Sequence, residues 1–285
     1  MSKKVKIAMG QLLVEGAEPK RNLKRAKDMI STASKRGADL IVLPETIDFA
    51  WTHPSLQKEA LPIPGDFSNF FVNLAKKNNI HICVGLTEKV KDSFFNTALL
   101  INRVGKIILK HRKINLLDVE QPFYKVGNKL EVVDTEFGKI GVNICADNYK
   151  NSTHLGKSLG HMGSDIILSP SAWTVDHSVT EADDPYKDKW EKPLTHIANM
   201  FEIPVISVTS VGYIVGGPYE GKKQIGGSMA VTSDGKVRKC KFNEFAGDLS
   251  FVSLDIDPKK KKGTALLDNL EKRGFKSELE INEKK

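Results

Sequence analysis

The sequence has few cysteines, and they are poorly placed for metal binding or disulfide pairing. Its 285 residues include Cys83, Cys145 and Cys240, which lie far apart and show none of the CxxC spacing of zinc or redox sites. Three cysteines cannot all pair with one another. We therefore expect free thiols in a reducing compartment, where a lone thiol can act as a nucleophile.

Long apolar runs and clustered arginines are also missing. No run is long enough to cross a bilayer, and Met1 to Lys4 leads into an alternating pattern instead of the unbroken apolar stretch of a signal peptide. We predict a soluble, cytoplasmic protein with no membrane partner. The net charge of +8 comes mostly from scattered lysines and from the run Lys259 to Lys262. This pattern favours a solvated surface and no nucleic-acid partner.

What the sequence does contain is alternating strand and helix patterns, with 40% hydrophobic residues to supply a core. Residues 5–9 alternate with the period of a strand, and Leu23, Ala26, Ile30 and Ala33 recur with the period of a helix. Residues 39–43 form the short apolar run of a buried strand. Three later helices, around 67–78, 153–162 and 190–201, each lead into a predicted strand, at 80–86, 165–169 and 204–208.

Turn sequences join three further pairs of predicted strands, at residues 98–101 and 106–111, 130–133 and 139–144, and 229–232 and 236–242. The patterns predict a mixed α/β sheet system covered by helices, in one domain over residues 1–257. Residues 258–285 form a lysine-rich tail. Its Leu266, Leu267 and Leu270 share a predicted helix face, which we expect to pack on a partner subunit.

Cys145 stands where an apolar strand ends. Ile140, Val142 and Ile144 share one face of that strand, and Cys145 begins the turn that follows. A nucleophile at such a turn is open to substrate, and the next backbone N–H groups can face a developing oxyanion. Taken alone, a single cysteine is more often a small buried side chain than a nucleophile.

Two glutamates and a lysine also lie near predicted strand ends. Glu45 follows Pro44 at the end of the buried strand, Lys113 follows the strand at 106–111, and Glu120 comes seven residues later. A thiol nucleophile needs a base and a positive group that stabilises charge, and these residue types supply both. Each of them alone is more often a solvated charge.

In combination these residues resemble the nitrilase superfamily. The resemblance spans the chain to about Ile256 and rests on stretches in the same order, namely Leu43-Pro44-Glu45, Arg112 to Leu116, Glu120 with Gly127, Gly141 to Asp147, Ser169 to Trp173, Gly226 to Ala230, and Asp234-Gly235. Two stretches depart from it, Thr195 to Asn199 in the helix before Pro204 and the residues after the cysteine. Many relatives continue after the cysteine with Tyr-Asp and then Arg-Phe-Pro-Glu, whereas this chain has Ala146-Asp147-Asn148-Tyr149-Lys150.

The resemblance implies a four-layer α-β-β-α sandwich of two mixed β-sheets flanked by helices, assembled as a homodimer or a larger homo-oligomer. It also implies a role for each site residue. Cys145 is the nucleophile, Glu45 the general base and acid, and Lys113 the positive partner of the tetrahedral intermediate. Glu120 supports the lysine. We assign substrate binding to Ala146, whose N–H is the second oxyanion donor, and to Asp147 and Trp173. No metal or organic cofactor is expected.

The function that follows is hydrolysis of a non-peptide carbon–nitrogen bond in a small linear amide or N-carbamoyl compound through a cysteine thioester. Hydrolysis of a nitrile is one alternative, and a catalytically silent binding or scaffold protein on the same fold is another. A papain-like pairing of Cys145 with a histidine is disfavoured, because none of the seven histidines stands in a recognisable strand-end motif.

Overall fold

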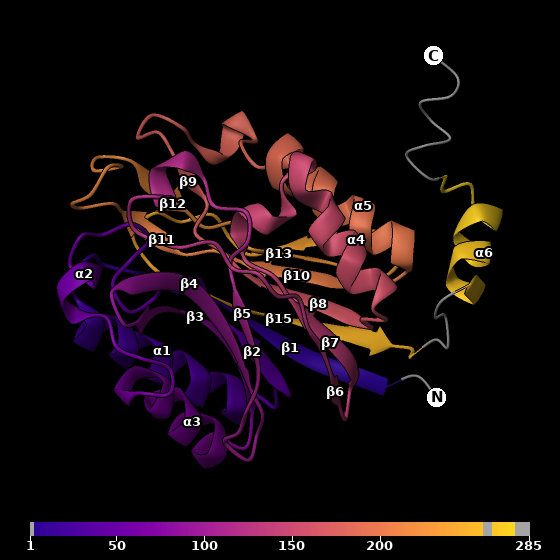
Figure 1. Ribbon diagram of the computed structural model, residues 1–285, viewed down its shortest axis with the longest axis horizontal. Helices are drawn as coiled ribbons and strands as arrows, with labels where there is room; N and C mark the ends of the chain where they lie inside the picture. The colour runs from indigo at the N-terminus through magenta and orange to yellow at the C-terminus, as the bar shows by residue number, and fades with distance from the viewer. Residues whose placement is uncertain (1–2, 259–263, 277–285) are drawn as a thin grey trace.

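The computed structural model describes residues 3–258 and 264–276, so the lysine run at 259–262 lies outside the described residues. Two six-stranded β-sheets lie face to face, and helices cover the outer side of each sheet (Figure 1). The predicted four-layer α-β-β-α sandwich of mixed sheets is thereby confirmed. No helix of the described residues is both long and apolar enough to span a bilayer.

The two large sheets repeat one pattern of strand directions. In each, three neighbouring strands run parallel, and the remaining strands join them antiparallel. The first sheet has the order β15 (Asp248–Ile256), β1 (Lys3–Gln11), β2 (Leu40–Val42), β3 (His81–Val90), β4 (Ser93–Ile101), β5 (Ile107–Arg112). The second has the order β14 (Val237–Lys239), β13 (Met229–Val231), β10 (Val205–Val208), β8 (Ile166–Pro170), β7 (Gly138–Val142), β6 (Val132–Thr135).

Helices connect the parallel strands, as parallel pairing requires. On the first sheet lie α1 (Pro19–Lys35) and α3 (Asp66–Asn78), and on the second α4 (Thr153–His161) and α5 (Lys192–Phe201) (Figure 1). The other helical elements are α2 (Leu56–Glu59), α6 (Thr264–Lys272), the 3₁₀ turns Asp118–Glu120, Cys145–Asn148, Lys150–Ser152 and Glu181–Asp183, and a π-helical turn at Lys187–Glu191. A small third sheet contains β9 (Thr174–Val175), β11 (Val211–Tyr213) and β12 (Lys223–Ile225).

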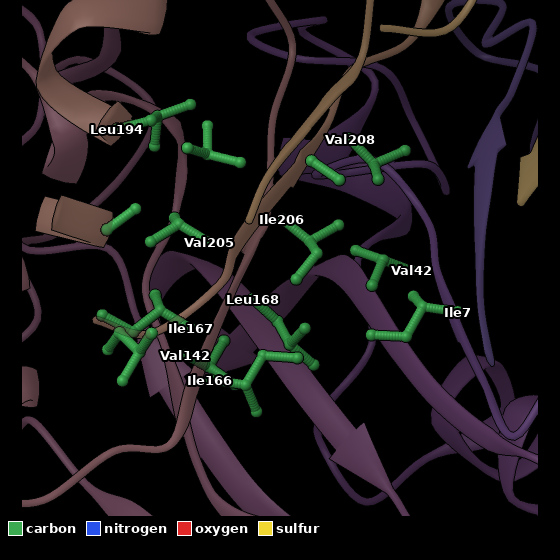
Figure 2. Close-up of a cluster of buried hydrophobic side chains, with 14 of the residues drawn as sticks. Ile7, Val42, Val142, Ile166, Ile167, Leu168, Leu194, Val205, Ile206 and Val208 are labelled. Carbon is green, nitrogen blue, oxygen red and sulfur yellow. The ribbon is translucent and has the colours of Figure 1, made fainter. Parts of the chain in front are cut away.

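The core between the layers follows from the alternation of side chains along the strands. On the paired strands β8 and β10, Leu168 and Ile206 point toward Val42 of the first sheet, whereas Ile167 and Val205 point toward Leu194 of α5 (Figure 2). All of these side chains are buried. Strands that are buried on both faces must be apolar at consecutive positions, which explains the short apolar runs in the sequence.

Most of the predicted elements are confirmed, including the three hairpins, which form β4–β5, β6–β7 and β13–β14. The sequence did not predict β15 or the small third sheet. Strand β15 pairs along its whole length with β1, from Lys3 opposite Ile256 to Gln11 opposite Asp248. No nearby turn marks a pairing over such a long sequence separation, which is why the pattern alone missed it.

Helix α6 packs on its own chain. Leu266 and Leu270 are each only 4% exposed and belong to the same core as Phe201 and Ile203, whereas Leu267 is 49% exposed. Arg273, just beyond the helix, donates a hydrogen bond of 2.9 Å to the backbone carbonyl of Met200. Two of the three leucines expected to meet a partner subunit are therefore covered within the chain, where they pack at the end of α5. Contact of this tail with a partner subunit stays a prediction.

This packing predicts unequal effects for neighbouring leucines of α6. Leu270→Ala removes a buried side chain and should lower the free energy of unfolding by about 2–3 kcal/mol. The matched control Leu267→Ala removes an exposed side chain and should change it by about 0.5 kcal/mol or less. Urea unfolding followed by circular dichroism measures both. Equal effects of the two substitutions would show that α6 does not pack in this way.

Candidate active site

Three of the predicted site residues follow strands at one end of the sandwich. Glu45 comes three residues after β2, and Lys113 comes directly after β5. Strands β2, β3 and β5 run in the same direction, so their C-terminal ends meet at one edge of the first sheet. Cys145 comes three residues after β7 of the second sheet, and a hydrogen bond of 3.3 Å from the N–H of Glu45 to the carbonyl of Ser171 links the two sheets here.

The backbone takes strained or crowded conformations around Glu45 and Cys145. Cys145 has φ of +44° and Thr46 has φ of +45°, both in the left-handed region that side chains other than glycine rarely occupy. Strand β3 passes so close to Glu45 that a Cβ on Gly85 would lie 2.3 Å from the Cα of Glu45. Gly85 therefore allows the main chain carrying Glu45 to lie directly against β3.

Lys113 is the centre of the charged cluster and is fully buried, with 0% of its side chain exposed. Its Nζ lies 2.8 Å from Glu120 Oε1 and 3.3 Å from Glu45 Oε2. Both carboxylates are buried as well. An ammonium group taken out of water needs such partners, since breaking a buried pair by removing one member costs about 3–5 kcal/mol.

Two further side chains hold the carboxylates, and the sequence did not point to either. Asn96 of β4 donates a hydrogen bond of 2.6 Å to Glu45 Oε2, and Trp51 donates one of 2.8 Å through Nε1 to Glu120 Oε1. Glu45 Oε1 is buried and has no hydrogen-bond partner among the described residues. One oxygen of Glu45 is thus fixed, and the other is free to accept a proton.

The ionisation of the cluster follows from burial and from the mutual charges. Burial raises the pKa of Glu45, although Lys113 opposes the shift. Burial also opposes the charged form of Lys113, but Glu120 and Glu45 together raise its pKa well above the usual value. For Cys145, burial and then the charge of Glu45 raise the pKa well above that of an ordinary thiol. The resting site therefore contains an ammonium group and a protonated thiol.

The surroundings of the thiol contain backbone donors. The N–H of Ala172 lies close enough to Cys145 to lower its pKa, which partly opposes burial. Ala146, which follows the cysteine, uses its carbonyl to accept hydrogen bonds of 2.7 Å from Asn115 Nδ2 and 2.6 Å from Ser152 Oγ. Within residues 3–258 and 264–276, its N–H donates no hydrogen bond. This is the N–H group that the sequence analysis predicted to be the second oxyanion donor.

Asp147 follows Cys145 by two residues, and hydrogen bonds from the protein's own groups occupy both oxygens of its carboxylate. Oδ1 accepts hydrogen bonds from the N–H groups of Ile114 at 3.1 Å and Asn115 at 2.7 Å. Oδ2 accepts hydrogen bonds from the N–H of Ile144 at 3.0 Å and from His111 Nε2 at 2.9 Å. Asp147 thus ties the chain just after Lys113 to the chain just before Cys145. These bonds give Asp147 a positioning role, and the substrate contact that the sequence predicted stays a prediction.

Trp173, the other predicted substrate-binding residue, belongs to a buried aromatic cluster. Its ring stacks on Trp190 with centroids 5.1 Å apart and an interplanar angle of 19°, and it packs on Tyr186 at 5.0 Å. Trp190 in turn contacts Tyr149 at 4.6 Å. The indole N–H of Trp173 is buried and has no acceptor among the described residues. The cluster forms an apolar wall near Cys145, and burial raises the pKa of both tyrosine hydroxyls.

Within the described part of the chain, no group of three or more histidine, cysteine, aspartate or glutamate side chains is arranged to hold a metal ion.

The bonds of Asp147 predict a large effect of a small substitution. Asp147→Asn removes the charge that accepts four hydrogen bonds, and it should lower the free energy of unfolding by about 3 kcal/mol at neutral pH. The bonds hold the pKa of Asp147 below the ordinary value, despite burial, so this contribution fades as pH falls. The control is Asp118→Asn at an exposed position. If Asp147→Asn and Asp118→Asn lower the free energy of unfolding equally at pH 7, the positioning role of Asp147 is contradicted.

Comparison with known proteins gives the family. Residues 6–258 match the family model described as carbon–nitrogen hydrolase. The omega-amidase NIT3 of Saccharomyces cerevisiae is 32% identical over 191 residues, which cover 61% of this chain and 65%, just under two thirds, of that protein. The deaminated glutathione amidase of Dictyostelium discoideum is 29% identical over 279 residues, which cover 90% of each chain.

Solved structures agree on the fold. The crystal structure of Saccharomyces cerevisiae Nit3, described as a member of branch 10 of the nitrilase superfamily, has a TM-score of 0.76 and 24% sequence identity, with 97% of each chain covered. At this identity the likeness concerns the fold. From the family match over most of its length, this chain belongs to the carbon–nitrogen hydrolase family.

Proposed function

We propose that this protein hydrolyses a non-peptide carbon–nitrogen bond in a small linear amide or N-carbamoyl compound, through a thioester on Cys145. One observation carries the proposal. A fully buried Lys113 contacts both Glu45 and Glu120, and the unpartnered oxygen of Glu45 lies in the same cluster as the thiol. Ion pairs that only stabilise a fold do not require a cysteine in a left-handed conformation, as Cys145 has here. They also do not require a carboxylate oxygen without a partner beside that cysteine.

In the first half-reaction, Glu45 accepts the thiol proton while the sulfur attacks the carbonyl carbon of the substrate. The raised pKa of Cys145 makes this transfer necessary, since little thiolate exists beforehand. Lys113 Nζ and the N–H of Ala146 then stabilise the oxyanion. The tetrahedral intermediate collapses when the carbon–nitrogen bond breaks, and Glu45 returns its proton to the departing amine.

In the second half-reaction, water replaces the amine. Glu45, again ionised, removes a proton from the water as its oxygen attacks the thioester carbonyl. The carbon–sulfur bond then breaks, the carboxylic acid leaves, and the sulfur regains its proton from Glu45. One carboxylate thus serves as base and then as acid in each half-reaction. Glu120 stays bound to Lys113 throughout and keeps the ammonium charged and in place.

Two observations favour an amide substrate and turnover over the alternatives. Both named relatives are described as amidases, and one of them aligns with 90% of this chain. A silent scaffold protein would have no reason to keep the costly buried charges of Lys113, Glu45 and Glu120 together. A homo-oligomeric state and a cytoplasmic location, both expected from the sequence, stay predictions.

The thioester itself can be detected. Glu45→Gln keeps the size and much of the hydrogen bonding of Glu45 but removes the base, so an activated ester should acylate Cys145 slowly and deacylation should stall. Intact-protein mass spectrometry should show the added acyl mass, and digestion should map it to the peptide containing Cys145. Wild-type protein with hydroxylamine should divert the acyl group to a hydroxamic acid.

The controls are the other two thiols. Cys83 and Cys240 are buried, and burial raises the pKa of the first far above the usual value and that of the second to about 12. Cys83→Ala and Cys240→Ala should keep most activity, whereas Cys145→Ala should abolish it in a folded protein. If a substrate is turned over by wild-type protein without any adduct or acyl transfer, water attacks directly and the thioester mechanism fails.

Lys113 should act through its charge on the oxyanion. Lys113→Met is similar in length but neutral, and it should lower kcat by roughly two to three orders of magnitude. The substitution also leaves two buried carboxylates without their cation. The double variant Lys113→Met/Glu120→Gln also neutralises one of these carboxylates. It therefore tests the same loss of positive charge in a fold that is less perturbed. A normal kcat with only a raised KM in either folded variant would show that the lysine merely binds substrate.

A further inference from the structure

The chain that follows β2 stays against β3 beyond the last residue of β2. The N–H of Gly85 donates a hydrogen bond of 3.0 Å to the carbonyl of Pro44, and the N–H of Ile47 donates one of 3.1 Å to the carbonyl of Gly85. The N–H of Thr87, two residues further along β3, donates at 2.8 Å to Oδ2 of Asp48. A carboxylate thus takes the place of a neighbouring-strand carbonyl where the chain leaves the sheet.

Two further hydrogen bonds reach the other oxygen of this carboxylate. Oδ1 of Asp48 accepts one of 3.1 Å from the N–H of Phe49 and one of 3.3 Å from the hydroxyl of Thr87. Asp48 is fully buried, and within residues 3–258 and 264–276 no lysine or arginine forms an ion pair with it. These three donors therefore compensate for its removal from water.

The segment that Asp48 holds has both of its ends in the charged cluster. Glu45 begins it and lies 3.3 Å from Lys113 Nζ, and Trp51 ends it with the hydrogen bond from its indole to Glu120. Three residues in or directly beside the segment are left-handed although none is glycine, namely Thr46, Ala50 and Thr52. Because such backbone persists only where surrounding contacts impose it, an anchor in the middle of the segment helps to set the position of both ends.

The strength of this anchor depends on the ionisation of Asp48. Burial raises the pKa of Asp48 to about 7, although the hydrogen bonds from Thr87 and Phe49 oppose the shift. The carboxyl group therefore changes its charge in the neutral range. The ionised form accepts all three hydrogen bonds. Protonation turns one oxygen into a donor, so at least one of the three bonds must weaken or reverse.

The groups that face Asp48 from neighbouring elements do not neutralise it. Tyr124, from the segment after the 3₁₀ turn Asp118–Glu120, has a buried hydroxyl without a hydrogen-bond partner among the described residues, and burial and then the charge of Asp48 raise its pKa. On α1, Asn22 Nδ2 lies 3.5 Å from the backbone carbonyl of Asp48. The charged residues nearby are paired with one another, as Glu88 with Lys110, Glu88 with Arg112, and Glu15 with Arg25.

We propose that Asp48 is a positioning residue for Glu45 and Trp51. Its ionised carboxylate anchors their segment to β3, and its protonation loosens the anchor and lowers the activity of the site. The site then responds to pH through a carboxyl group that takes no part in the proton transfers. This inference rests on the proposed amide hydrolysis and adds a form of regulation to it.

The test is the pH dependence of kcat/KM for a small neutral amide. Wild-type activity should rise about fivefold from pH 6 to pH 8 as Asp48 ionises. Asp48→Asn keeps the size of the side chain but cannot ionise, so its activity should stay near the low-pH level of wild type. Any inflection that belongs to Glu45 should persist in this variant.

A milder pair of variants changes one hydrogen bond to Asp48. Thr87→Val removes the hydroxyl that favours the ionised carboxylate, so the inflection should move to higher pH. Thr87→Ser keeps the hydroxyl and should keep the inflection. Leu270→Ala, which destabilises the fold at α6, should keep the wild-type profile as well. The proposal is overturned if Asp48→Asn has the same pH profile as wild type, or if Thr87→Val leaves the inflection where it was.

Alkylation of Cys145 by iodoacetamide separates this inference from the proposed function, because it requires no turnover. Its rate depends on a base placed to accept the thiol proton. The ratio of the wild-type rate to that of Asp48→Asn, followed by mass spectrometry, should rise from about one at pH 6 to about five at pH 8. A rising ratio in a protein that hydrolyses no amide supports the anchor and refutes the proposed function. A constant ratio in a protein that does hydrolyse amides refutes the anchor alone.

Discussion

One ammonium group buried between two carboxylates is the interaction on which the rest of this structure depends. Lys113 contacts Glu120 and Glu45 away from water, where an unpaired charge would be costly. The surrounding features serve to keep this arrangement in place: Asn96 and Trp51 fix the carboxylates, Gly85 leaves room for the backbone, and Asp147 ties the lysine loop to the cysteine turn. At this end of the sandwich, the same contacts therefore stabilise the fold and position the residues proposed to react.

The sequence predicted the parts of this arrangement that have local signals. Pro44 ends a buried strand just before Glu45, and an apolar alternation stops just before Cys145, so strand ends could be located and polar residues assigned to them. Buried parallel strands leave apolar runs, and tight hairpins leave turn residues. Both signals are short-range, which explains why most strands were predicted while β15 and the small third sheet were not. The four layers were predicted from the family resemblance.

Other features of the site have no such signal. Asn96 looks like an ordinary polar residue of a strand until β4 is placed beside β2 and β3. Asp147 lies two residues after the nucleophile, which suggested contact with substrate, yet its carboxylate turns inward to His111 and three backbone N–H groups. The direction of a side chain at a turn depends on the backbone torsion of its neighbours, here the left-handed Cys145, and sequence spacing does not reveal it.

The pairing of the first strand with the last has a consequence for the order of assembly. The sheet that carries Glu45 and Lys113 gains its outer strand from residues 248–256, after the whole second sheet has been synthesised. Contacts of such long sequence separation form slowly, because a large loop must close first. A growing polypeptide thus holds an incomplete first sheet until its final strand emerges. The free edge of β1 is covered only when the two ends of the domain meet.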